Sequence, residues 1–76
     1  MKSREVNQRI ESLGGYETRQ RGSHRRYAAA YADPKGVERT AFTTVQQHKS
    51  QDIPLGTLKS IQRDMAPAFG EGWLLG

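Results

Sequence analysis

The sequence predicts a two-layer α+β domain in which two helices cover one face of a three-stranded antiparallel sheet. An apolar stripe at helical spacing occurs near each end of the 76-residue chain, and the segment between the stripes is rich in residues that favour strands. Each stripe has to be buried against another element, so both helices are expected on one face of the sheet, with the other face open. The predicted order is helix, strand, strand, strand, helix, in a single domain that spans residues 1–76.

The first helix is predicted to begin at Arg4, with Ser3 as its N-cap and Glu5 in the first turn, where the helix dipole favours an anion. Val6, Ile10 and Leu13 form its apolar stripe. The pair Gly14-Gly15 supplies a left-handed stop. This helix is therefore expected to pack its stripe into the core.

The second helix is predicted to begin near Pro54, a residue suited to a first helical turn. Leu55, Leu58, Ile61 and Met65 repeat at helical spacing. Pro67 and Gly70 are expected to end the helix. The glycine-rich tail from about residue 69 is unusually apolar, so it either folds back over the core, which we favour because exposed Trp and Leu reduce solubility, or docks on a partner.

Three strands are predicted between the helices, at Tyr16–Gln20, from His24 to about Tyr31 and from about Val37 to Gln46. Arg21-Gly22-Ser23 forms the first turn and the segment 32–36 the second.

Side chains alternate along a strand, so Tyr27 and Tyr31 share one face of the second strand and His24 and Arg26 share the other. The tyrosine face is the better candidate for packing on helices, which predicts that His24 points outward. The facing of Phe42, on the open side or in the core, stays undecided at this stage.

Composition points to a polyanionic partner. Twelve Lys and Arg against eight Asp and Glu give a net charge of +4, and only 34% of residues are apolar. Nucleic acid or an acidic protein fits such a charge. The absence of cysteine removes disulfides and thiolate metal sites. The N-terminus lacks the apolar run of a signal peptide, and no apolar stretch approaches the length of a membrane span. We therefore expect a cytoplasmic protein without a membrane association.

The segment from Gln20 to Tyr27 places one imidazole, His24, among guanidinium groups. Histidine exchanges a proton near neutral pH, and arginine clamps phosphate through paired hydrogen bonds. This combination indicates a site that holds a phosphodiester and moves a proton on it. Carboxylates are scattered and the two histidines lack a third ligand, so neither a metal nor another cofactor is expected.

Several motifs occur together over roughly Ser3 to Gln62: Gly15-Tyr16, Arg19-Gln20, Gly22-Ser23-His24, Tyr27, His48, the run Asp52-Ile53-Pro54-Leu55-Gly56-Thr57-Leu58, and Ile61. In residues and in order, they resemble the HicA-type mRNA interferase toxins. The sequence departs from the family pattern in its tail after Ala66 and at Gln46, where a proline is common. Neither departure is expected to touch the chemistry.

The resemblance implies a fold like the double-stranded RNA-binding domain, metal-independent cleavage of mRNA, and inhibition by a HicB-type antitoxin. It also implies that His24 is the catalytic residue of a toxin from a type II toxin–antitoxin pair. The free toxin is expected to be monomeric and to form a hetero-oligomer with the antitoxin.

Arg26 and His48 are the candidates for catalytic support, although a structural role for His48 is favoured over a catalytic one. The expected RNA-binding residues are Arg19, Arg21, Gly22, Ser23, Arg25, Arg26, Lys49 and Lys59.

Two other functions fit the same residues. A non-catalytic RNA-binding module would use the basic face for phosphate and 2′-hydroxyl contacts without cleavage. A protein-interaction domain would use it only to dock an acidic partner. RNA cleavage in the presence of EDTA would distinguish the ribonuclease from both of these alternatives.

Overall fold

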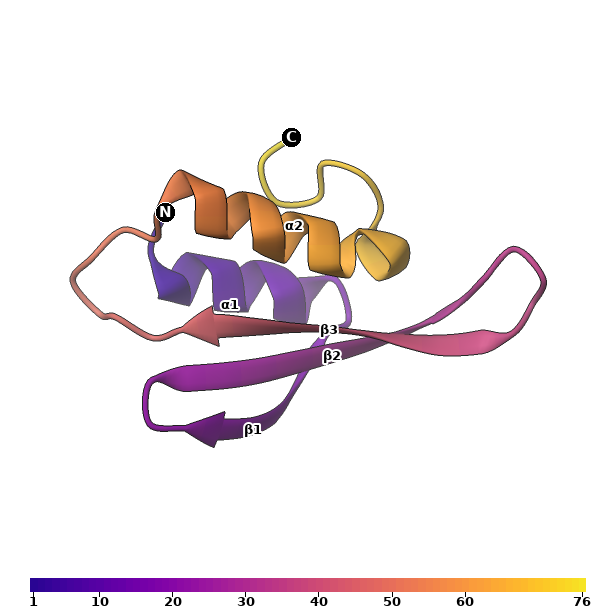
Figure 1. Cartoon of the computed structure of the whole chain (residues 1–76), viewed down its shortest axis with the longest axis horizontal. Coiled ribbons are helices and arrows are strands. Elements are labelled where there is room, and N and C mark those ends of the chain that lie inside the picture. Colours follow the sequence, from indigo (N-terminus) through magenta and orange to yellow (C-terminus); the bar gives the residue numbers. More distant parts are fainter.

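Two helices lie on one side of a three-stranded antiparallel sheet in the computed structural model, which describes residues 1–76 (Figure 1). The elements are α1 (Ser3–Ser12), β1 (Tyr16–Arg21), β2 (His24–Ala32), β3 (Glu38–Gln46) and α2 (Leu55–Phe69). The strand order is β1-β2-β3. This confirms the predicted α+β class and element order, and the order is compatible with the double-stranded RNA-binding domain type. Neither helix is long and apolar enough to cross a membrane.

The core lies between the helices and the sheet. Its buried apolar residues are Val6 and Ile10 of α1, Leu58, Ile61 and Met65 of α2, Tyr27 and Ala29 of β2, Ala41 and Val45 of β3, and Trp73. Both predicted stripes therefore face the sheet, except that Leu13 and Leu55, at one end of each stripe, remain exposed. Burial of this apolar surface supplies the main driving force for folding.

The facing of β3 is decided by three buried residues. Ala41, Thr43 and Val45 point to the helices, and the hydroxyl of Thr43 donates a hydrogen bond of 3.0 Å to an Asp64 carboxylate oxygen on α2. Phe42 alternates with them and is 45% exposed on the open face. The parity predicted for β2 is also confirmed, since Tyr27 is buried and His24 is exposed.

Two predicted helix ends differ from the structure. The first helix starts one residue early, at Ser3, and Lys2 occupies the N-cap position. Glu5 explains the shift, because its carboxylate accepts a hydrogen bond of 3.0 Å from the Lys2 backbone N–H. Ser3 is buried in the first turn instead of capping it.

Pro67 does not end the second helix, which continues to Phe69. A proline removes one backbone donor and crowds the preceding turn, yet the helix continues for two residues beyond Pro67. Gly70, with a φ of 94°, ends the helix, and its N–H donates to the Ala66 carbonyl at 2.7 Å.

The apolar tail folds back over the helices, as favoured from the sequence. Trp73 is 5% exposed and belongs to the core, and its indole N–H donates a hydrogen bond of 2.8 Å to the Gln62 carbonyl. Figure 1 shows this yellow segment returning over α2. The tail therefore completes the hydrophobic core.

Two glycines permit a matched test of the packing. A Cβ at Gly15 would collide with Ile10 Cγ2 and lie 3.0 Å from the Ile10 carbonyl oxygen, so Gly15→Ala is expected to cost about 1–3 kcal/mol of unfolding free energy. At Gly56 in α2, a Cβ would meet nothing within 4 Å, so Gly56→Ala is expected to add about 0.4–1 kcal/mol. Urea denaturation of both variants checks the pair, and equal effects would contradict the close packing at Gly15.

Candidate active site

His24 is the first residue of β2 and lies directly after the Gly22-Ser23 turn, exposed on the open face of the sheet. Gly22 has a φ of 54°, in the left-handed region that favours glycine. The turn is fixed on both sides. The Gln47 N–H donates to the Ser23 carbonyl at 2.6 Å, and the Gln20 side-chain amide donates to the Gly22 carbonyl at 2.9 Å. The imidazole therefore projects from a well-anchored part of the backbone.

A β-bulge in β1 brings two arginines to the face that carries His24. The register between β1 and β2 shifts between Glu17 and Arg19. Beyond the shift, Arg19 pairs with Arg26 and Arg21 pairs with His24. Directly paired residues share a face of the sheet, so both β1 arginines lie on the side of the imidazole. The extra residue is Thr18, whose hydroxyl donates to the Arg26 carbonyl at 3.3 Å.

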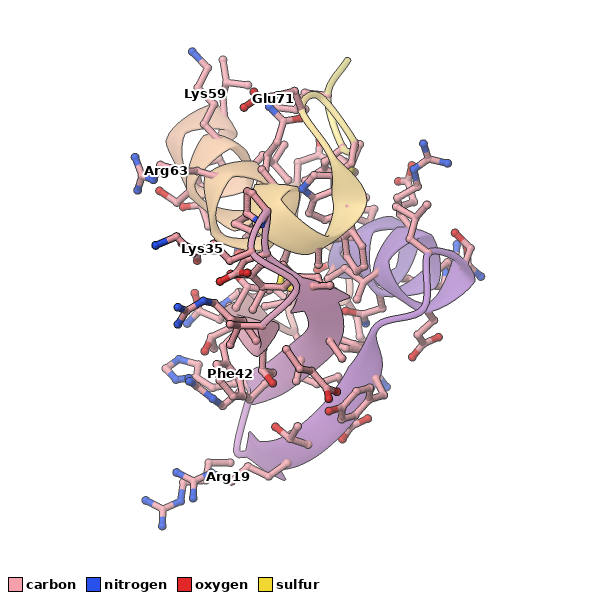
Figure 2. All side chains as sticks on the ribbon, turned by 90° about the vertical axis from the view of Figure 1, so that its right-hand side faces the viewer. Arg19, Lys35, Phe42, Lys59, Arg63 and Glu71 are labelled. Atoms are coloured by element: carbon pink, nitrogen blue, oxygen red, sulfur yellow. The ribbon has the colours of Figure 1, made fainter.

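These side chains surround a shallow hollow of about 180 Å³. Its lining consists of Arg19, Arg21, His24, Arg26 and Thr44. None of the three arginines forms an ion pair, and Figure 2 shows Arg19 extending away from the body of the molecule. The hollow therefore presents uncompensated positive charge beside an accessible imidazole, an arrangement suited to a phosphate.

Gln46, one of the departures from the family pattern, lies against the imidazole. It is the cross-strand partner of His24, and its amide nitrogen lies 3.2 Å from His24 Nε2. An amide can donate to one tautomer of the ring or accept from the other, so this contact bears on which ring nitrogen carries the proton. The residue was missed because the signal is the β2–β3 register and not a local motif.

A second, larger cavity of about 740 Å³ opens on the other side of the Gly22-Ser23 turn. Its lining is wholly polar apart from a glycine and comprises Lys2, Ser3, Arg4, Asn7, Gln20, Gly22, Ser23, Arg25, Gln47 and Lys49. The predicted binding residues Gly22, Ser23, Arg25 and Lys49 thus meet here, whereas His24 does not line this cavity. The larger cavity offers cations to an anionic ligand, but only the smaller hollow adds an imidazole.

Arg25 lies on the helix side of the sheet and is held by its neighbours. Its guanidinium donates to the Tyr27 hydroxyl at 3.3 Å and lies 3.5 Å from a Glu17 carboxylate oxygen. The hydrogen bond to Tyr27 and the nearby Glu17 and Glu11 raise the pKa of Arg25. Burial raises the pKa of Tyr27, whose hydroxyl donates to Glu11 at 3.1 Å. Arg25 is therefore held between β1 and Tyr27, and it is Tyr27 that ties β2 to α1.

The structure does not bring His48 and Lys59 into either cavity. His48 is exposed in the β3–α2 loop, which the N-terminal segment holds: Lys2 Nζ donates to the Ser50 carbonyl at 2.9 Å and lies 3.5 Å from an Asp52 carboxylate oxygen. Lys59 lies on α2, at the opposite end of the view from Arg19 (Figure 2). No group of three or more His, Asp or Glu side chains is placed to hold a metal ion.

Comparison with known families now adds to this geometry. Residues 3–66 match the family described as "HicA toxin of bacterial toxin-antitoxin". The chain belongs to the HicA toxin family. Its matched region contains α1, the whole sheet and most of α2, and so includes every residue around the hollow and nearly every residue around the larger cavity. A search of curated proteins and a search of solved structures gave no match.

Membership makes this HicA chain the toxin of a toxin–antitoxin system, so its partner is an antitoxin. The tail that completes the core lies beyond the matched residues. The exposed imidazole lies within them, on the face of the sheet that no helix covers.

Proposed function

We propose that this HicA protein is a metal-independent endoribonuclease that cleaves mRNA and so inhibits translation, with His24 as its general acid or base. The observation that carries the proposal is an exposed imidazole on the open face of the sheet, bordered by three arginines that form no ion pairs. Family membership supports the same function, because it makes the chain a toxin.

The reaction uses a nucleophile that RNA itself supplies. The 2′-oxygen forms a bond to phosphorus while the bond from phosphorus to the 5′-oxygen breaks, which leaves a 2′,3′-cyclic phosphate and a 5′-hydroxyl. His24 takes the proton from the 2′-hydroxyl or gives one to the leaving 5′-oxygen, and solvent handles the other proton. Such proton transfer contributes about 10²–10⁴-fold in rate.

The arginines of the hollow stabilise the charge that grows on the phosphate oxygens. Arg26 lines the hollow together with Arg19 and Arg21, both of which the bulge brings to this face. Arg25 and Lys49 contribute instead from the larger cavity, where they contact the RNA backbone away from the cleaved bond.

A HicB-type antitoxin is proposed as the partner. Covering the open face would hide His24 from RNA, and acidic side chains would neutralise the arginines of the hollow. The complex is then a cytoplasmic hetero-oligomer that separates to release an active monomeric toxin.

The direct test uses two substrates of one sequence, an RNA oligonucleotide and its 2′-deoxy counterpart, each incubated with the protein in EDTA. RNA is expected to be cut to products that end in a 2′,3′-cyclic phosphate, while the deoxy strand stays intact. Cleavage of both strands, or cleavage that stops with the chelator, would refute the proposed mechanism. Binding of RNA without any cleavage would favour the non-catalytic module.

Gln46 provides a second test through its contact with His24 Nε2. Gln46→Ala is expected to slow cleavage about 2- to 10-fold, the worth of one ordinary hydrogen bond. Gln46→Glu places a carboxylate beside the ring and stabilises its protonated form, so the pH dependence of cleavage should shift to higher pH. The readout is the pH–rate profile of each variant. A purely structural role for Gln46 would lower the rate without moving the profile.

A further inference from the structure

The open face of the sheet continues beyond the hollow, and its residues follow from the register. Three successive rows cross the three strands: Arg21, His24 and Gln46; then Arg19, Arg26 and Thr44; then Tyr16, Ala28 and Phe42. No carboxylate occurs in these rows. The first acidic residue on this face is Glu38, which pairs with Ala32 at the far end of β2.

The third row, which we call the aromatic row, exposes two large rings on either side of a small residue. Tyr16 is 53% exposed and Phe42 is 45% exposed, while Ala28 between them is 1% exposed. The two rings come from strands that lie on either side of β2, about 10 Å apart at the usual strand spacing. Two exposed aromatic side chains in one row of an otherwise polar surface indicate a binding surface.

Arg26 connects the aromatic row to the imidazole. Its guanidinium carbon lies 4.7 Å from the centroid of the Phe42 ring. Guanidinium planes and aromatic rings both stack on nucleic-acid bases, and the same guanidinium can contact a phosphate. The separation of His24 from Ala28 along β2 is about 13 Å at the usual rise per residue. A base on the aromatic row is thus near the phosphate at His24 without belonging to the cleaved bond.

We propose that the open face binds single-stranded RNA. Unpaired bases stack on Phe42 and Tyr16, and the phosphates run past the row of Arg19 and Arg26 towards His24. This inference rests on the proposed ribonuclease function and specifies that the RNA substrate is single-stranded. Charge selects the polyanion, since the three rows contain three arginines, one histidine and no acid. The exposed rings select the unpaired strand, because a duplex keeps its bases stacked inside and offers a protein mainly shape, phosphates and 2′-hydroxyls.

The test measures binding without cleavage. His24→Ala protein, in EDTA, is titrated into a fluorescein-labelled RNA oligonucleotide and into the same strand annealed to its complement, with fluorescence anisotropy as the readout. The single strand is expected to bind more tightly. Adding Phe42→Ala should weaken binding of the single strand roughly 5- to 100-fold, the range for one lost base stack, and leave duplex binding unchanged. Leu55→Ala, which removes an apolar side chain 59% exposed on α2, is the matched control and should change neither.

Salt dependence separates stacking from charge. Phe42→Ala should leave the slope of log affinity against log salt unchanged, whereas Arg26→Gln should reduce it by about 0.7, the value for one phosphate contact on a single strand. A slope that falls with Phe42→Ala would mean that the ring acts only by positioning Arg26, which contradicts stacking.

Several outcomes would overturn the inference. Equal binding of duplex and single strand would do so, as would a Phe42→Ala variant that binds RNA normally but loses its complex with the antitoxin, since the aromatic row would then be a protein interface. Failure of the proposed function looks different: wild-type protein would leave RNA intact while binding of the single strand still depended on Phe42. Conversely, if Phe42→Ala binds RNA normally and, in a protein that keeps His24, cleaves it normally, only the stacking surface is refuted.

Discussion

Replacement of His24 by alanine is expected to reduce RNA cleavage about 10²–10⁴-fold, the usual contribution of a general acid or base. The imidazole is exposed and lies on the opposite face of the sheet from the core, so the thermal unfolding temperature should stay close to that of the wild type. The measurement is the rate of oligonucleotide cleavage in EDTA, with circular dichroism on the same samples. In bacteria, induction of the wild type should arrest growth and induction of His24→Ala should not.

The second histidine provides the matched control. His48 lies in the β3–α2 loop and lines neither cavity, so His48→Ala is expected to cleave at close to the wild-type rate. An equal loss in both variants would indicate that two imidazoles share the acid and base roles. Full activity in His24→Ala would refute the proposed mechanism.

Trp73→Ala is expected to cost about 3–5 kcal/mol of unfolding free energy, a large share of the total for so small a protein. The indole is 5% exposed and meets the Phe69 ring edge-on, with 5.0 Å between the ring centroids and an interplanar angle of 74°. The substitution would leave a cavity and would also remove the donor to the Gln62 carbonyl. Urea denaturation measures the loss.

Leu75→Ala serves as the control from the same tail. Leu75 is 37% exposed, and its backbone N–H, which the substitution keeps, donates to the Gln62 side chain at 2.7 Å. The expected change lies within about 0.5 kcal/mol, as for ordinary surface substitutions. A small effect of Trp73→Ala as well would show that the tail does not contribute to the core.

Patterns of local spacing predicted most of the fold. The stripe that contains Ile10 and the alternation that buries Tyr27 each repeat with the period of one element, and both are borne out. The exposure of His24 followed from the same alternation. Of the two residues expected to end the second helix, Gly70 does so, whereas Pro67 lies within the last turn, because the loss of one backbone donor does not by itself stop a helix.

Contacts that depend on how two strands align cannot be predicted from local sequence patterns. The sequence alone decides neither the facing of Phe42 nor the contact of Gln46, because only the β2–β3 pairing shows that Phe42 faces solvent and that Gln46 contacts His24. On that face, the row of Arg26 and Thr44 lies between Phe42 and the imidazole. The β1 bulge left no local signature, since Thr18 is an ordinary strand residue.

That one additional residue has a consequence for comparing related chains. Without Thr18 as the unpaired position, Gln20 would oppose His24 in place of Arg21, and both β1 guanidinium groups would turn towards the helices. Two toxins of identical overall composition can therefore carry very different surface potentials around the imidazole, depending on the parity of their first strand. When related chains are aligned in this region, the number of residues in the first strand should be compared before the identity of its residues.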